Sequence, residues 1–334
     1  MIDQTIVFPK PVYVAETATI AGPKESEGPL KEYFHYCLKD DLLKQKSHEH
    51  AEIKMHTSVL RQLLERAGIE KEEIDCAFAG DLLDEIISSN FCMRELDFPF
   101  MGVYNACATL AEAYILAGSM ISTGIMHNVV CSVSSHFATA ERQYRYPLEL
   151  GSQRTPLAQW TVTGAAATLL TDRKSSNVKI TAGTIGRVTD YGVKDANDMG
   201  GVMAPAALST LIAHLSATKT SPEQYDLIVT GDLGHSGSRL LQKLAEKEGI
   251  NLENNYTDCG ILVYNREGQD VGQGGSGACC CGLVFNSYIY KQMKMGKYRK
   301  VLLMPTGALL SKTSSLQGES IPAICHAVSF EVDQ

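Results

Sequence analysis

Short apolar runs, each ending at a glycine, alternate along the chain with stretches of helical periodicity. Residues 75–79 (DCAFA) and 225–230 (YDLIVT) are nearly continuous apolar runs of this kind. Such runs are typical of strands that are buried on both faces of a parallel sheet. Each follows a stretch that places its leucines on one helical face, within 58–67 and 207–215. The alternation predicts an α/β protein made of stacked layers.

The same pieces occur twice. Residues 71–82 (KEEIDCAFAGDL) correspond to residues 222–233 (PEQYDLIVTGDL), with the aspartates and glycines at a constant offset. Residues 105–133 correspond in the same way to residues 277–304. Two halves built alike indicate a duplicated unit, and functional sites commonly lie where such units join.

Composition and charge narrow the classes of function. The chain has 334 residues, a net charge of −8 and no cluster of Lys and Arg. This balance disfavours nucleic acid as a partner and offers no anchor for anionic lipid. We find no stretch near the roughly 20 apolar residues that a membrane span needs, and no signal-peptide core at the N-terminus. The ten cysteines form no CxxC pair, which suits reduced thiols in a cytoplasm-like compartment.

Cys107 is the most promising position for chemistry. It follows an extended segment, 98–104, and begins a helix whose apolar residues recur at helical spacing. A thiol at a helix N-terminus faces the positive end of the helix dipole, which predicts a lowered pKa and a more nucleophilic sulfur. The alternative is that Cys107 is one more small buried apolar residue. We favour the first interpretation because of the strand–turn–helix context.

These segments resemble thiolases and β-ketoacyl synthases. The resemblance lies in Asn-Ala-Cys (105–107) at the helix start, the Ala-rich helix after it, and VTGAAATLL (162–170) near the end of the first half. It covers nearly the whole chain and implies a five-layer αβαβα sandwich of two duplicated halves, which we place at residues 1–172 and 173–334.

The chain departs from the synthases where their catalysis is performed. In the resemblance, Asp232 stands where the second half supplies a histidine, and Gly275 stands near the position of the second polar partner. His235 lies three residues beyond Asp232 and is better interpreted as a loop histidine. A cysteine without a base or oxyanion donors is a poor Claisen catalyst. We therefore predict a protein that is not an enzyme, with a Cys107-dependent acyl-CoA or acyl-carrier acyltransferase as the alternative.

Longer strings resemble a specific family, the stage V sporulation protein AD family of endospore-forming bacteria. They include AGPKESEGPL (21–30), SSHFATAERQYRYPLE (134–149), DMGGVMAPAAL (198–208) and QGESIPAICHAV (317–328). The resemblance implies a protein that binds dipicolinic acid, a small planar dicarboxylic acid. It also implies that the protein acts together with membrane proteins of the same sporulation transport system, which move the acid into the developing spore. The implied location is the spore, in solution or peripheral on its inner membrane, and a homodimer is possible.

The ligand site is expected around Cys107 and the loop that begins at Asp81. Asp81 and Asp84 follow the carboxyl end of a predicted buried strand, where α/β folds place ligands. Their carboxylates suit Ca²⁺ that arrives as part of a dipicolinate chelate; we expect no resident metal or cofactor. The alternative for Asp81 is a helix N-cap, and the two interpretations are balanced. Further candidates for contact with the ligand are Asp232, His235 and Glu319.

Three arginines offer a different way to hold the free acid. Arg142, Arg145 or Arg187 can bind a carboxylate through two parallel hydrogen bonds. The alternative, which we favour from the sequence, is that these arginines form ion pairs at the surface.

Overall fold

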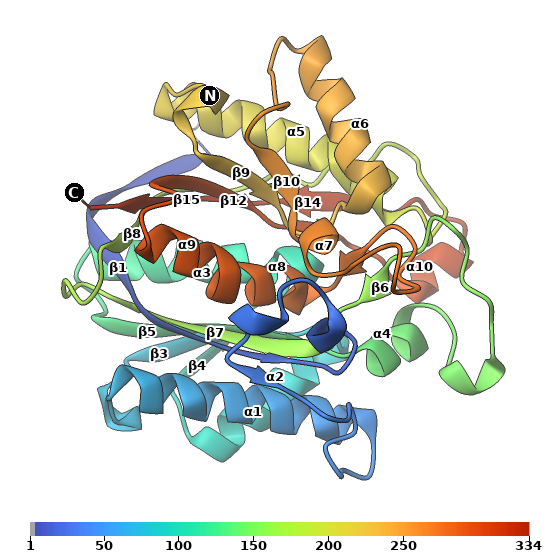
Figure 1. The fold of residues 1–334 in the computed structure, drawn as a ribbon, viewed down its shortest axis with the longest axis horizontal. Helices are drawn as coiled ribbons and strands as arrows, with labels where there is room; N and C mark the ends of the chain where they lie inside the picture. Colours follow the sequence, from blue (N-terminus) through green and yellow to red (C-terminus); the bar gives the residue numbers. More distant parts are fainter. Residues whose placement is uncertain (1–3, 334) are drawn as a thin grey trace.

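Residues 4–333 are described by a computed structural model in which helices and strands form five layers (Figure 1). One outer layer holds α1 (His48–Ala67) and α2 (Ile87–Leu96), and the other holds α5 (Met199–Thr218) and α6 (Gly234–Lys247). Between the two sheets lie α3 (Thr109–Ser122), α8 (Ala278–Val284) and α9 (Tyr290–Lys294). The predicted αβαβα sandwich is therefore confirmed.

The two halves have the same strand order. In the first half the order is β4 (Phe100–Gly102), β3 (Cys76–Gly80), β5 (Asn128–Ser135), β7 (Gly164–Thr171) and β1 (Thr5–Ala21). In the second half it is β10 (Tyr256–Asp258), β9 (Leu227–Thr230), β12 (Lys300–Met304), β15 (Ala327–Val332) and β8 (Val178–Thr184). In both, the first three strands are parallel and the last two join antiparallel. The matching strands predicted around residues 75–79 and 225–230 thus occupy equivalent places.

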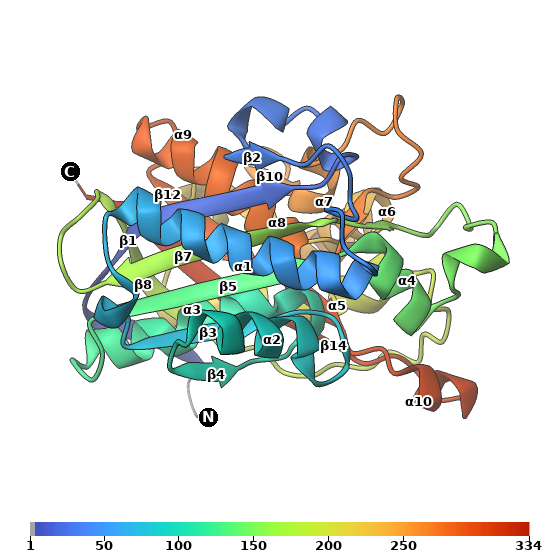
Figure 2. The same cartoon turned by 90° about the horizontal axis from the view of Figure 1, so that it is seen from below.

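The halves are joined by hydrogen bonds between strands. The long strand β1 pairs with β7 through residues 13–21 and with β8 through residues 5–7 and 12–13, antiparallel in both cases. The register shifts between Val7 and Val12, where the strand passes from one sheet toward the other. Figure 2 shows β1 running diagonally beside β7 and α1. The division into halves at residue 172 remains a prediction.

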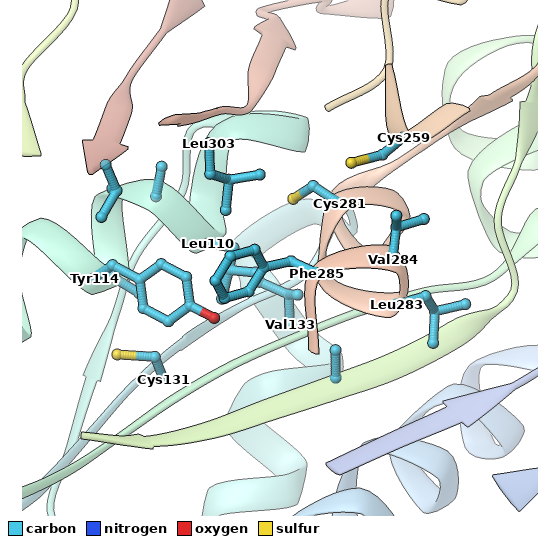
Figure 3. Packing of buried hydrophobic residues seen from close by; sticks show 14 of the residues in the cluster. Leu110, Tyr114, Cys131, Val133, Cys259, Cys281, Leu283, Val284, Phe285 and Leu303 are labelled. Atoms are coloured by element: carbon cyan, nitrogen blue, oxygen red, sulfur yellow. The ribbon is translucent and has the colours of Figure 1, made fainter. Parts of the chain in front are cut away.

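Helices cover both faces of the inner strands, and this explains their apolar sequences. All eight residues of β7 are buried, because α1 packs on one face and α8 on the other. Figure 3 shows the middle layer, where Leu110 and Tyr114 of α3 meet Phe285. The Tyr114 hydroxyl is satisfied there by Thr168, whose Oγ1 lies 2.7 Å away. A continuous apolar run was therefore the correct signal for these strands.

The expectation that no stretch approaches the length of a membrane span was wrong. Helix α5 is long and apolar enough to cross a membrane, with a mean hydropathy of 1.3 over its best window, 61% of which is buried in the fold. It packs against α6 and the short strands β13 (Thr306–Ala308) and β14 (Ala323–Cys325). The apolar residues of α5 are thus used here to pack this outer-layer helix against the rest of the fold.

Candidate functional site

Cys107 lies at a sharp turn between β4 and α3. Residues Ala106–Ala108 form one turn of 3₁₀-helix, and Ala106 has a φ of 50°, a conformation that side chains with a Cβ rarely adopt. Gly307 packs directly beneath this turn, since a Cβ there would lie 2.3 Å from the Asn105 carbonyl oxygen. Strained backbone of this kind is retained where surrounding structure holds it, commonly at functional sites.

A small chamber opens above the Cys107 thiol. Its volume of about 50 Å³ has room for roughly three or four water molecules. The walls combine residues of both halves, chiefly apolar: Leu82, Ala106, Ala140, Tyr144, Arg145, Thr161, Met199, Met203, Ser276, Gly277, Ala308 and Leu310. The site therefore lies at the join between the halves, as the duplication predicted.

Asp232 is fully buried behind the chamber wall, beside the Cys107 thiol. Its Oδ2 accepts hydrogen bonds from the Ser276 hydroxyl at 2.9 Å and from the Gly277 amide at 3.2 Å, and its Oδ1 accepts from the Thr306 hydroxyl at 2.8 Å. Ser276 Oγ is also 3.9 Å from the Cys107 sulfur. The residue expected at the position of the family histidine thus does reach Cys107, as a fully buried carboxylate.

The predicted low pKa of Cys107 is wrong. Burial raises the pKa of the thiol well above its usual range, and the Asp232 carboxylate raises it further. Burial also raises the pKa of Asp232. Within residues 4–333, the Cys107 thiol is hydrogen-bonded to Ser276 and to the Asp232 carboxylate, and no histidine side chain is hydrogen-bonded to it. The helix-terminus argument failed because desolvation and a neighbouring anion outweigh the dipole.

Arg145 is the cation of the chamber. Its side chain is 13% exposed and forms an ion pair of 2.5 Å with Glu141, one turn earlier on α4 (Phe137–Tyr144). Its Nε is buried and has no hydrogen-bond partner. From the sequence we favoured ion pairs at the surface for all three arginines. This prediction is correct for Arg142, which pairs with Glu49 at the surface. Arg187 is exposed, whereas Arg145 faces the chamber.

Asp81 lies outside the chamber wall. Its Oδ1 accepts from the Leu83 amide at 2.9 Å, and its Oδ2 accepts from the amide and the hydroxyl of Ser89, both at 2.7 Å. The side chain is fully buried, and burial raises its pKa. These bonds tie the loop after β3 to α2. The geometry favours the capping interpretation of Asp81 over direct contact with a ligand.

The other sequence-predicted candidates lie apart from the chamber. Asp84 is exposed and lines an outer cavity next to it. His235, in the first turn of α6, faces a different depression, which Arg266 and Tyr264 also line. Burial lowers the pKa of His235, and Arg266 and Arg239 lower it further. Glu319 is exposed beyond α10 (Lys312–Leu316).

Sequence reasoning missed several wall residues. We aligned Gly275 with the family's second polar partner. Ser276 is the next residue, so an alignment that is off by one position overlooks it. Tyr144 was also missed, although it belongs to the string that carries the family resemblance. Its neighbour Arg145 was named from the sequence as one of three arginines able to hold the free acid, but only the fold shows which of the three faces the chamber. Trp160 drew no interpretation as an isolated residue, although it stacks on Phe137 at 3.6 Å next to this site.

Known proteins resemble the chain over its whole length. The sequence model described as Stage V sporulation protein AD matches residues 2–331. The curated Stage V sporulation protein AD of Bacillus subtilis (strain 168) is 39% identical over 328 residues, which cover 98% of this chain and 96% of that protein.

Solved structures resemble the chain in fold. The crystal structure of 3-oxoacyl-(acyl-carrier-protein) synthase III from Aquifex aeolicus VF5 has a TM-score of 0.57 and 15% identity, covering 98% of this chain and 99% of that one. OleA from Xanthomonas campestris, in a form with bound lauric acid and lauroyl-CoA, has a TM-score of 0.62 and 14% identity, covering 97% and 99%. At this identity the likeness shows the thiolase-like fold alone.

Proposed function

The chain belongs to the stage V sporulation protein AD family, and from this premise we propose that it binds dipicolinic acid in the chamber at Cys107. The binding serves the uptake of the acid into the developing spore. The protein acts there without covalent chemistry, as a receptor for a small planar dianion.

The observation that carries the proposal is the state of Arg145. A guanidinium that is mostly buried and retains an unpartnered Nε faces a chamber whose other walls are chiefly apolar. Planar guanidinium groups bind carboxylates through two parallel hydrogen bonds, and this pairing strengthens away from water. Apolar walls with one well-placed polar group are typical of sites for small ring compounds. Met199 and Met203 of α5 supply adaptable wall contacts for the ring.

Calcium enters the proposal only as part of the ligand. Asp84 is the sequence-predicted carboxylate that lines a neighbouring cavity, so it is placed to complete the oxygen shell of a chelated Ca²⁺ at the outer end of the ligand. Asp81 already accepts three hydrogen bonds and supports the loop from below. In this proposal the free acid contacts Arg145, whereas the Ca²⁺ chelate also contacts Asp84. Variants of these two residues therefore distinguish binding of the free acid from binding of the chelate.

A second candidate function is an acyltransferase that uses Cys107. The half-exposed thiol at a strained turn supports it, because this is the geometry of an accessible nucleophile. The raised pKa of the thiol opposes it, since the thiolate is the reactive form. Incubation with acetyl-CoA followed by intact-protein mass measurement decides between them. An acetyl adduct that is absent from Cys107→Ala would favour the enzyme.

Calorimetry with dipicolinate, with and without Ca²⁺, tests binding. We expect Arg145→Gln to weaken affinity for the free acid at least tenfold, because it removes the charge that faces the carboxylate. Arg142→Gln is the matched control: it lies on the same helix, is paired at the surface, and should leave affinity unchanged. Equal affinities for wild type and Arg145→Gln would place the acid elsewhere, and no heat of binding with wild type would end the proposal.

The remaining proposals concern assembly. We propose that the protein works with membrane proteins of the same sporulation system, peripheral on the inner spore membrane, and that it can form a homodimer. The terminal strand β4 supports the dimer, because it is the last strand of the sheet within residues 4–333 and carries Met101 at 52% exposure. Sedimentation equilibrium measures the dimer, and membrane fractionation of sporulating cells measures the location.

A further inference from the structure

Tyr144 separates the inner chamber from two larger cavities at the surface. One outer cavity, which we call the Trp160 cavity, has a volume of about 420 Å³ and includes Trp160, Arg154 and Lys312. The other, the Asp84 cavity, has a volume of about 490 Å³ and includes Asp84 and Glu85. Tyr144 and Leu310 line all three spaces. A ligand on its way to Cys107 therefore passes Tyr144 from one side or the other.

The two outer cavities differ in charge. The Trp160 cavity is lined by three cations, Arg145, Arg154 and Lys312, and its acidic residue, Glu141, is already paired with Arg145 at 2.5 Å. The Asp84 cavity presents Asp84 and Glu85 with Lys312 at the shared rim. In the Trp160 cavity Arg154 is likewise paired, with Asp270 at 2.9 Å, so three cations face two carboxylates. In a chain with a net charge of −8, the Trp160 cavity thus has an excess of one positive charge. Such a region concentrates anions and speeds their association.

The Trp160 cavity also contains an ordered cluster of aromatic rings and cations. Trp160 stacks on Phe137 with ring centroids 3.6 Å apart and planes within 2°. The Arg154 guanidinium lies 4.6 Å from the centroid of Trp160 and is held by hydrogen bonds of 2.9 Å to the carbonyl and the carboxylate of Asp270. The Lys24 ammonium also lies over the Trp160 ring, 4.1 Å from its centroid. An aromatic dicarboxylate entering this cavity therefore meets anchored cations and the edge of Trp160, which suit its carboxylates and its ring edge.

Tyr144 closes the inner chamber through its hydroxyl. The hydroxyl donates to the Leu82 carbonyl and lies 3.0 Å from the Tyr104 hydroxyl, so two contacts hold the ring in place. With Tyr144 in this position the chamber of about 50 Å³ is too small for a ring with two carboxylates. Because Tyr144 is the wall shared with the larger cavities, its displacement joins the chamber to them.

We propose that the Trp160 cavity is the entrance and first binding subsite for the aromatic dicarboxylate, and that Tyr144 is the gate to the chamber at Cys107. This inference rests on the proposed function and adds the route, the subsite and the gate. Binding then has two steps: fast capture by Arg154 and Trp160, followed by slower passage past Tyr144.

Stopped-flow tryptophan fluorescence tests the proposal with dipicolinate, excited where the acid does not absorb. Trp160 is the only tryptophan in the chain, so its emission reports the outer subsite directly. For wild type we expect a fast phase that depends on dipicolinate concentration and slows with salt, followed by a phase independent of concentration. Arg154→Gln should slow the first phase at least fivefold. Glu85→Gln, in the Asp84 cavity, is the matched control and should leave it unchanged.

Tyr144→Phe tests the gate, because it removes the hydroxyl contacts and keeps the ring. We expect the second phase to become at least threefold faster. Arg154→Lys, which retains the charge, should keep most of the first-phase rate and guards against a folding defect in Arg154→Gln. If calorimetry detects binding while Trp160 emission stays constant, or if Glu85→Gln rather than Arg154→Gln alters capture, the route is wrong although the function stands. Absence of calorimetric binding would instead refute the proposed function.

Discussion

The Cys107 thiol and the Asp232 carboxylate lie side by side at the wall of the chamber, although they are 125 positions apart in the chain. Ser276 connects them, since its hydroxyl donates to Asp232 at 2.9 Å and lies 3.9 Å from the sulfur. An anion beside a thiol disfavours the thiolate. The pair therefore keeps Cys107 protonated in a fold whose enzymes need a reactive residue at that turn.

Replacing Asp232 by Asn should lower the pKa of Cys107, because it removes the negative charge next to the sulfur. The measurement is the pH dependence of alkylation by iodoacetamide, followed by mass on the peptide that contains Cys107. We expect the midpoint of the profile to move to lower pH. Asp226→Asn, which alters a surface turn at the start of β9, serves as the control. A midpoint that stays in place would mean that burial alone sets the pKa.

Cys107→Ala should reduce dipicolinate affinity more than it reduces stability. Cys107 is partly buried and lines the chamber, so its truncation enlarges an existing space and should cost less than about 1 kcal/mol of the free energy of unfolding. Urea unfolding and calorimetry on the same preparation give both quantities. Cys131→Ala is a contrast, because that thiol is fully buried in β5 and its loss should mainly destabilise the protein. The reverse ranking would make Cys107 a core residue.

Asp81→Ser should destabilise the loop between β3 and α2. The substitution leaves the Leu83 and Ser89 amides without their buried acceptor, which should cost about 1–3 kcal/mol of the free energy of unfolding. Affinity for free dipicolinate should change little in the folded variant. A selective loss of affinity for the Ca²⁺ chelate would show instead that Asp81 reaches the metal.

Glu52→Gln should make stability less dependent on pH. Burial, and then the nearby Asp81 carboxylate, raise the pKa of Glu52 from 4.5 to about 8. The folded state therefore binds more protons than the unfolded chain between these values, and the free energy of unfolding falls as pH rises through this range. Relative to wild type, Glu52→Gln should retain about 3–4 kcal/mol more stability at about pH 8 than at about pH 5.

Urea unfolding at the two pH values measures this difference. Glu49→Gln is the matched control, because Glu49 precedes Glu52 by one turn of α1 and pairs with Arg142 at the surface. Its pH profile should follow that of wild type. Parallel profiles for Glu52→Gln and wild type would mean that Glu52 is already ionised in the folded protein at neutral pH.

The fold was predictable because its signals are local and occur twice. The apolar run at 75–79 and its copy at 225–230 mark β3 and β9 to within two residues, and the glycines after them end both strands. The helix predicted at 58–67 extends back to His48, because Ser47 caps it. Its first turns mix exposed polar residues such as His50 with buried polar ones such as Glu52. Periodicity alone does not detect such turns.

The site was only partly predictable, because its geometry depends on contacts between distant residues. Asp232 could be placed beside Cys107 from the duplication and the family resemblance. The raised pKa of the Cys107 thiol could not be predicted from the sequence, since it depends on burial and on the carboxylate of Asp232, 125 positions further along the chain. The same holds for Arg145, whose place in the chamber follows from the end of α4 at Tyr144 and from no pattern in the sequence.

The passage of β1 from one sheet to the other has a consequence for synthesis on the ribosome. The first residues of β1, Thr5–Val7, pair only with β8, at residues 182–184. A nascent chain that has emerged through β7 can complete the first sheet while the start of β1 still lacks its neighbour. That end remains an open edge until β8 leaves the exit tunnel, and such edges invite pairing with other chains. A pause in translation before β8 has left the exit tunnel therefore prolongs the time for which this edge is open to misassembly.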